Sequence, residues 1–63
     1  MQTLNTAIDQ AKKISKRPGY LDNEIIIYIH PDGEYNLAKN NDGKEVMSIS
    51  FNGHQFNQSI LTA

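Results

Sequence analysis

The fold is decided by residues 24–37, which read EIIIYIHPDGEYNL. Residues 24–30 are mainly isoleucine and tyrosine, which are β-branched or aromatic and therefore suit the pleated surface of a strand. Pro31-Asp32-Gly33 predicts a three-residue hairpin loop, because proline presets the first turn dihedral and glycine takes the left-handed conformation of a bulge. We therefore expect two antiparallel strands, at residues 24–30 and 34–39.

A second polar turn, residues 40–44, predicts a hairpin into a third strand at residues 45–51. Counting back from the two turns pairs Ile29 with Tyr35, Ile27 with Leu37, Lys39 with Glu45, Leu37 with Met47 and Tyr35 with Ile49. In this register one face collects the apolar side chains Ile25, Ile27, Ile29, Tyr35, Leu37, Met47, Ile49 and Phe51. A slip of one residue would turn this set to solvent. The two hairpins agree, and they predict an antiparallel meander whose first strand lies at an edge.

An amphipathic helix is expected over residues 3–17, ahead of the strands. Its apolar residues recur at helical spacing along one stripe: Leu4, Ala7, Ile8, Ala11 and Ile14. Thr3 or Asn5 can cap the first free amides, and Pro18-Gly19 stops the helix. The helix stripe would cover the apolar face of the sheet.

The last twelve residues contain Asn52-Gly53, a strong signal for a two-residue hairpin turn. A turn there sets Phe56 opposite Ile49 and predicts a fourth strand at residues 54–60, with a helical turn at residues 59–61 as the alternative. The sequence as a whole predicts a single α+β domain over residues 1–63. In this fold class an N-terminal amphipathic helix packs on a three- to four-stranded antiparallel meander sheet.

Composition limits the chemistry that these 63 residues can carry. There is no cysteine, so disulfides and thiolate metal sites are excluded. The two histidines, His30 and His54, have no metal-ligand spacing, and no nucleophile or glycine-rich phosphate loop forms a motif. We expect neither an enzyme nor a bound cofactor.

The longest continuous apolar run, residues 25–29, is far shorter than the roughly 20 residues that span a bilayer. The N-terminal residues lack the basic-then-apolar pattern of a signal peptide. Without an export signal or cysteines, the expected location is the cytoplasm, and no membrane partner is expected.

The sheet face opposite the helix is the first candidate binding surface. By strand alternation it carries Ile26, Tyr28, His30 and Val46, although an exposed sheet face is normally polar. We expect these residues to form a protein interface, with a protein partner of unknown identity and with a homodimer made through the sheet face or the edge strand. Two alternatives remain. The C-terminal residues could cover the patch, or Ile26 and Tyr28 could be present only because such side chains favour strand formation.

The second candidate is the basic end of the helix, which carries Lys12, Lys13, Lys16 and Arg17. Four cations within six residues can contact nucleic-acid phosphates. They can also form a solvated face that complements the helix dipole. The net charge of −1 argues against strong nucleic-acid binding.

These observations favour a small non-catalytic protein-binding module. Compact domains of this kind often come from phages and mobile elements, and they inhibit or modulate a host protein complex. An inhibitor of that type is therefore the expected role. The alternative is a nucleic-acid-binding accessory or regulatory protein that uses the basic helix end.

Overall fold

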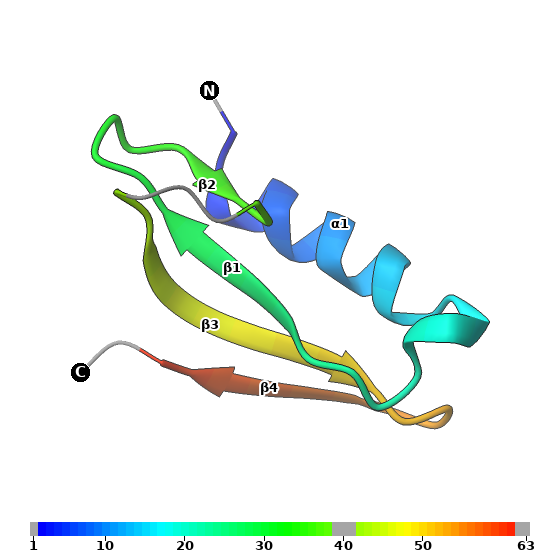
Figure 1. The fold of residues 1–63 in the computed structure, drawn as a ribbon. Coiled ribbons are helices and arrows are strands. Elements are labelled where there is room, and N and C mark those ends of the chain that lie inside the picture. Colours follow the sequence, from blue (N-terminus) through cyan, green and yellow to red (C-terminus); the bar gives the residue numbers. More distant parts are fainter. Residues whose placement is uncertain (1, 39–41, 62–63) are drawn as a thin grey trace.

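The computed structural model describes residues 2–38 and 42–61. A helix, α1 (Leu4–Ser15), is followed by a short 3-10 helix, η1 (Pro18–Tyr20). The four strands are β1 (Ile25–Ile29), β2 (Tyr35–Asn36), β3 (Lys44–Phe51) and β4 (Phe56–Ile60). The strands form one antiparallel sheet, and α1 packs on β1, β3 and β2 (Figure 1). The predicted fold class, a helix on an antiparallel sheet, is confirmed, and so is the fourth strand.

The order of the strands differs from the prediction. It is β2-β1-β3-β4, so β1 lies inside the sheet and pairs with β2 on one side and β3 on the other. The predicted meander order, with β1 at an edge and β2 paired with β3, is wrong. The physical reason lies in β1 itself, whose five residues are all isoleucine or tyrosine. A central position pairs both of its edges, which removes the exposed apolar edge that the meander would have created.

The first hairpin keeps its predicted register. Ile29 lies opposite Tyr35, the His30 N–H donates to the Glu34 carbonyl at 2.9 Å, and Gly33 has a φ of 87°. However, β2 ends at Asn36, whose side-chain oxygen accepts from the Ala38 N–H at 3.3 Å. This local turn takes the chain out of the ladder, so the predicted pairing of Ile27 with Leu37 does not form. The predicted pairing of Lys39 with Glu45 lies outside the described residues.

A β-bulge interrupts the pairing of β3 with β1. Ile25 lies opposite Ile49 and Ile27 opposite Met47. The predicted pairings of Ile49 with Tyr35 and of Met47 with Leu37 therefore do not form. The register then shifts, so that Tyr28 faces Glu45. Val46 is the extra residue, and it packs against the hydrophobic core. Because a bulge breaks the alternation of side chains, Val46 leaves the outer face on which the sequence placed it.

The core lies between α1 and the central strands. Its buried residues are Ala7, Ala11, Ile27, Met47 and Ile49. The helix contributes small side chains at four-residue intervals, with Ser15 continuing the row and donating its hydroxyl hydrogen bond to the Lys12 carbonyl. The small side chains let the helix approach the sheet closely. Thr3 caps the helix, and its side chain accepts from the Thr6 N–H at 3.2 Å.

The turn between β3 and β4 is longer than predicted. Phe51 lies opposite Phe56, so four residues form the loop, and Asn52 holds it by accepting from the N–H groups of His54 and Gln55. The predicted pairing of Phe56 with Ile49 is therefore shifted by two residues. A two-residue shift preserves the face, and Phe56 still packs against the core. The alternative of a helical turn at residues 59–61 is wrong, because Ser59 and Ile60 belong to β4.

Candidate interaction surfaces

Two residues of the predicted sheet-face patch, Ile26 and Tyr28, lie together on β1. Both are half-buried, and both alternate with the fully buried Ile27, so they face away from α1. Ile26 lies opposite the small Ser48 on β3. Tyr28 lies between two polar residues of the neighbouring strands, Asn36 and Glu45. The outer face of the sheet therefore carries a small apolar patch, Ile26 and Tyr28, bordered by polar side chains.

The other two residues of that predicted patch lie elsewhere. Val46 packs towards the core because of the bulge. His30 is only 9% exposed, and its ring lies against Gly43, where an added Cβ would meet His30 Cε1 at 2.8 Å. Among the described residues, His30 Nε2 is buried and has no hydrogen-bond partner. Of the four residues, only Ile26 and Tyr28 are available to form an outer-face contact.

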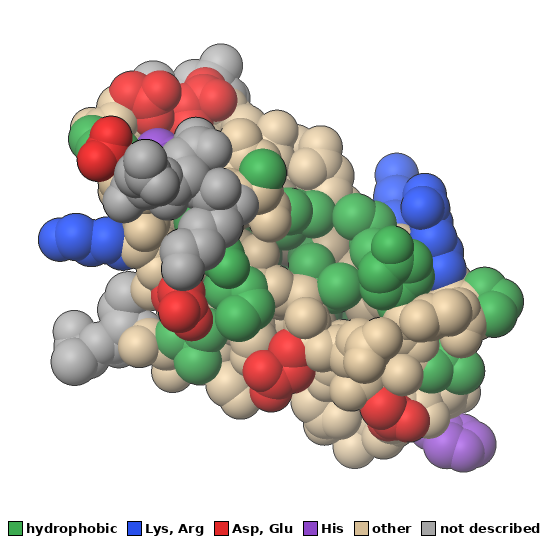
Figure 2. Space-filling view, viewed as in Figure 1, with side chains coloured by type: hydrophobic (Ala, Val, Ile, Leu, Met, Phe, Trp, Pro, Cys, Tyr) green, Lys and Arg blue, Asp and Glu red, His purple; other side chains and the backbone are tan. Residues whose placement is uncertain are grey.

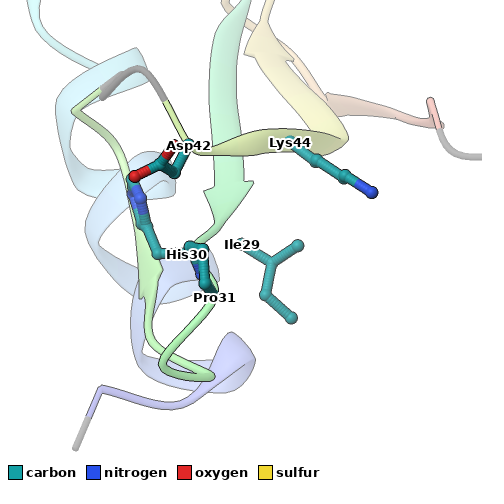
Figure 3. A pocket seen from close by; sticks show the side chains of 5 residues that line it. All are labelled: Ile29, His30, Pro31, Asp42 and Lys44. Atoms are coloured by element: carbon teal, nitrogen blue, oxygen red, sulfur yellow. The ribbon is translucent and has the colours of Figure 1, made fainter.

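His30 also borders a shallow pocket of about 260 Å³. Its lining residues are Ile29, His30, Pro31, Asp42 and Lys44. Figure 3 shows the Asp42 and His30 side chains on one side of the pocket, whereas the Lys44 side chain points to the other side. No group of three metal-ligating side chains occurs in the part of the chain that the structure describes. The pocket lies where β1 ends and β3 begins, and it was not anticipated from the sequence.

The free edge of the sheet belongs to β4. The opposite edge strand, β2, has two residues, and the Tyr35 N–H is already bonded to the Gln2 carbonyl at 3.1 Å. β4 has five residues, and four of them are exposed. Ile60 is 71% exposed and the adjacent Leu61 is 42% exposed. β4 therefore offers the longer and more accessible edge for another strand.

Hydrogen bonds at both ends of the β3–β4 ladder fix which backbone groups face this edge. The Leu61 N–H donates to the Val46 carbonyl at 2.9 Å, and the Asn52 N–H donates to the Gln55 carbonyl at 3.3 Å. Bonded and non-bonded pairs alternate along an antiparallel ladder. The outward N–H and C=O groups of β4 are therefore those of Phe56, Gln58 and Ile60.

The predicted meander also ended on the fourth strand, but the sequence favoured the apolar first strand as the docking edge. A usable signal was present in the residues Asn57-Gln58-Ser59, which are polar on both faces of the strand. A strand buried on one face alternates apolar and polar residues, and a central apolar strand is apolar on both. A strand that is polar on both faces indicates an edge that the helix does not cover.

The four predicted basic residues remain close together at the end of α1, but two of them already have a partner. The ammonium groups of Lys12 and Lys16 lie 5.2 and 5.3 Å from the centroid of the Phe56 ring. Lys13 and Arg17 are exposed. Figure 2 shows basic side chains grouped at one end of the molecule; several acidic side chains lie at the other end, and further acidic side chains lie between the two ends. The cluster therefore contributes to a contact between α1 and β4 as well as to a positive surface.

Comparison of the chain with protein-family models, curated proteins and solved structures gives no match. Within the two described segments, no helix is long and apolar enough to cross a membrane.

Proposed function

We propose that this chain is a small non-catalytic protein-binding module that docks on a partner through the free edge of β4. The observation that carries the proposal is the exposure of β4 on four of its five residues, with its outer backbone groups unpaired among the described strands. A partner's extended segment can add to such an edge by main-chain hydrogen bonds, while neighbouring side chains provide specificity. Ile60 and Leu61 supply exposed apolar contacts at one end.

The composition of β4 supports this role. Natural edge strands are commonly protected by charged residues, by proline or by a bulge. Phe56–Ile60 contains no charged residue and no proline, and its register with β3 is regular. An unprotected edge on a very small domain favours a chain that works by attaching to another protein. Inhibition or modulation of a larger host complex, encoded by a phage or mobile element, is the form of this function that suits the size of the chain.

Gln58→Pro tests the proposed surface. Proline removes one outward N–H of β4, and it is tolerated on edge strands when the missing N–H faces solvent. We expect Gln58→Pro to fold but to lose the partner proteins that the wild-type chain retains in an affinity experiment from its native cells. The control is Gln10→Asp, an exposed substitution on α1 that should retain the same partners. Aspartate is used at this position because proline would break the helix. Equal retention by Gln58→Pro and wild type would refute β4 docking.

Nucleic-acid binding is the second candidate, and the gathering of cations beside an aromatic ring favours it. Lys13 and Arg17 are exposed, and they lie at the same helix end as the two lysines above Phe56. Contacts to phosphates release counterions, so binding must weaken as salt rises. A gel-shift series with duplex DNA and RNA should then show salt-sensitive binding that Lys13→Glu with Arg17→Glu abolishes. No shift at low salt would refute this function.

A further inference from the structure

We infer that the occupant of the β4 edge is β4 of a second copy of this chain, paired antiparallel about a two-fold axis at Gln58. The inference rests on the proposed function, because it names the partner of the same edge. In this arrangement Phe56 lies opposite Ile60 of the other copy, Asn57 opposite Ser59, and Gln58 opposite Gln58. The two four-stranded sheets then form one continuous sheet.

The backbone supports this register. The outward groups of β4 belong to Phe56, Gln58 and Ile60, as the ladder with β3 requires. A two-fold axis at Gln58 makes these same three residues the hydrogen-bonded positions of the new ladder. Every outward N–H and C=O of both strands then has a partner. A register moved by one residue would instead bring outward groups against groups that already bond to β3.

The side chains of β4 are also self-complementary. Phe56 opposite Ile60 is an aromatic and β-branched cross-strand pair, a combination that stabilises antiparallel sheets. It covers Ile60, which is 71% exposed in the single chain. The remaining pairs join amide and hydroxyl side chains, which can hydrogen-bond to one another. β4 carries no charge, so no like charges oppose each other across the seam.

Charge complementarity selects the antiparallel direction. β4 begins at the end of the molecule that carries the four cations. Asp22 and Glu24 are the acidic residues at this end, and the Asp22 N–H donates to the Phe51 carbonyl at the end of β3. It ends near the start of β3, where Asp42 and Glu45 flank Lys44, and the β1–β2 turn at the same end of the sheet carries Asp32 and Glu34. Antiparallel pairing sets the basic end of each copy beside the acidic end of the other. Parallel pairing would bring the two basic ends together.

Space on the helix side of the sheet permits this pairing. α1 packs mainly on β1 and β3, and it reaches β4 through the lysine contacts with Phe56 (Figure 1). The edge of β4 therefore extends beyond the helix. A second chain can approach it from the side without displacing any described element.

Cysteine cross-linking tests the register directly, because the natural chain has no cysteine. At the two-fold axis the Cα atoms of the two Gln58 residues would lie about 5.5 Å apart, within the range that a disulfide spans. Gln58→Cys is therefore expected to form a covalent dimer under mild oxidation. The matched control is Ile60→Cys. In the proposed register the two Ile60 residues of the dimer are offset by four residues along the strands, so their Cα atoms would lie roughly 13 Å apart. Ile60 is 71% exposed, so a cysteine there is accessible and would also cross-link if the chains met only by random collision.

Sedimentation of the wild-type chain over a wide range of concentration supplies the second measurement. We expect a monomer–dimer equilibrium that Gln58→Pro weakens by about tenfold or more, because the seam loses a hydrogen-bonded pair. A monomer at all concentrations, or equal cross-linking of Gln58→Cys and Ile60→Cys, would overturn the inference. A dimer in which Gln58→Cys does not cross-link would overturn it as well. If the chain is monomeric and Gln58→Pro still loses a different partner protein, the proposed function stands without the dimer.

Discussion

β1 and β4 are both five-residue strands that pair with β3, yet they are buried to very different extents. β1 is paired on both edges and lies under α1, and Ile27 at its centre is 0% exposed. β4 is paired on one edge, and only Phe56 among its residues is partly buried. The difference shows that the core lies on the central strands β1 and β3, whereas β4 extends past the helix. The buried core and the proposed binding surface therefore lie on different strands.

The largest expected difference between β1 and β4 is in the free energy of unfolding that is lost when an isoleucine is replaced by alanine. Ile27→Ala should destabilise the domain by about 2–5 kcal/mol, because it removes a fully buried side chain and leaves a cavity. Typical stabilities of about 0.05–0.15 kcal/mol per residue give roughly 3–9 kcal/mol for this chain. The variant should therefore be close to unfolding at room temperature, which urea denaturation followed by circular dichroism would measure.

Ile60→Ala is the matched control on β4. An exposed substitution is expected to change stability by less than about 0.5 kcal/mol at a concentration where the chain is monomeric. Similar losses for the two variants would contradict the assignment of the core to β1, because β4 would then carry equal weight in folding.

This contrast also indicates what the sequence could predict. The helix, the first hairpin and the fourth strand follow from local signals: the apolar stripe that includes Ala7 and Ala11, the Pro31-Asp32-Gly33 loop and the Asn52-Gly53 turn. Each signal acts within a few residues, so a single sequence is enough to read it. The inward face of β1 was predicted for the same reason.

The strand order could not be read in this way. Whether β3 pairs with β2 or with the other side of β1 depends on which arrangement buries more apolar surface, and turn signals are the same for both. The bulge at Val46 is also non-local, because it fits β3 to β1. For the candidate site, Ile26 and Tyr28 were placed on the correct face, but the burial of His30 against Gly43 was not predicted. The fourth strand lies at an edge in both orders, but the predicted order also exposed the apolar first strand, which therefore stood out as the docking edge.

A smaller effect is expected where β1 ends and β3 begins. In Gly43→Ala the new Cβ would lie 2.8 Å from His30 Cε1, so the ring or the backbone must move. Overpacking of this kind costs about 1–3 kcal/mol. We expect a lower urea midpoint for the variant, together with shifted NMR resonances of the His30 ring.

Gly19→Ala is the control for this substitution, because nothing lies within 4 Å of the Cβ that it adds. Its stability should remain within about 0.5 kcal/mol of the wild-type value. If Gly43→Ala were equally neutral, the contact between His30 and Gly43 would not hold the two strands in register at this end of the sheet.

The smallest expected effect concerns the attachment of β4 to the helix. Lys12 and Lys16 place their ammonium groups over the Phe56 ring, which also packs at 4.9 Å between ring centroids on Phe51. An exposed cation–π contact contributes about 0.5–1 kcal/mol. Lys16→Gln should therefore lose about 0.5 kcal/mol or slightly more, and the loss should disappear when Phe56 is replaced by leucine.

A double-mutant cycle of Lys16→Gln with Phe56→Leu measures this coupling in urea denaturation, and Lys13→Gln gives the reference for an exposed lysine on the same helix. A coupling for Lys16 that is no larger than the one for Lys13 would mean that the ring does not hold the ammonium groups. β4 would then be attached to the domain by β3 and the packing of Phe56 alone. A measured coupling would instead show that the basic helix end stabilises the position of the edge strand, which links the basic cluster to the proposed docking edge.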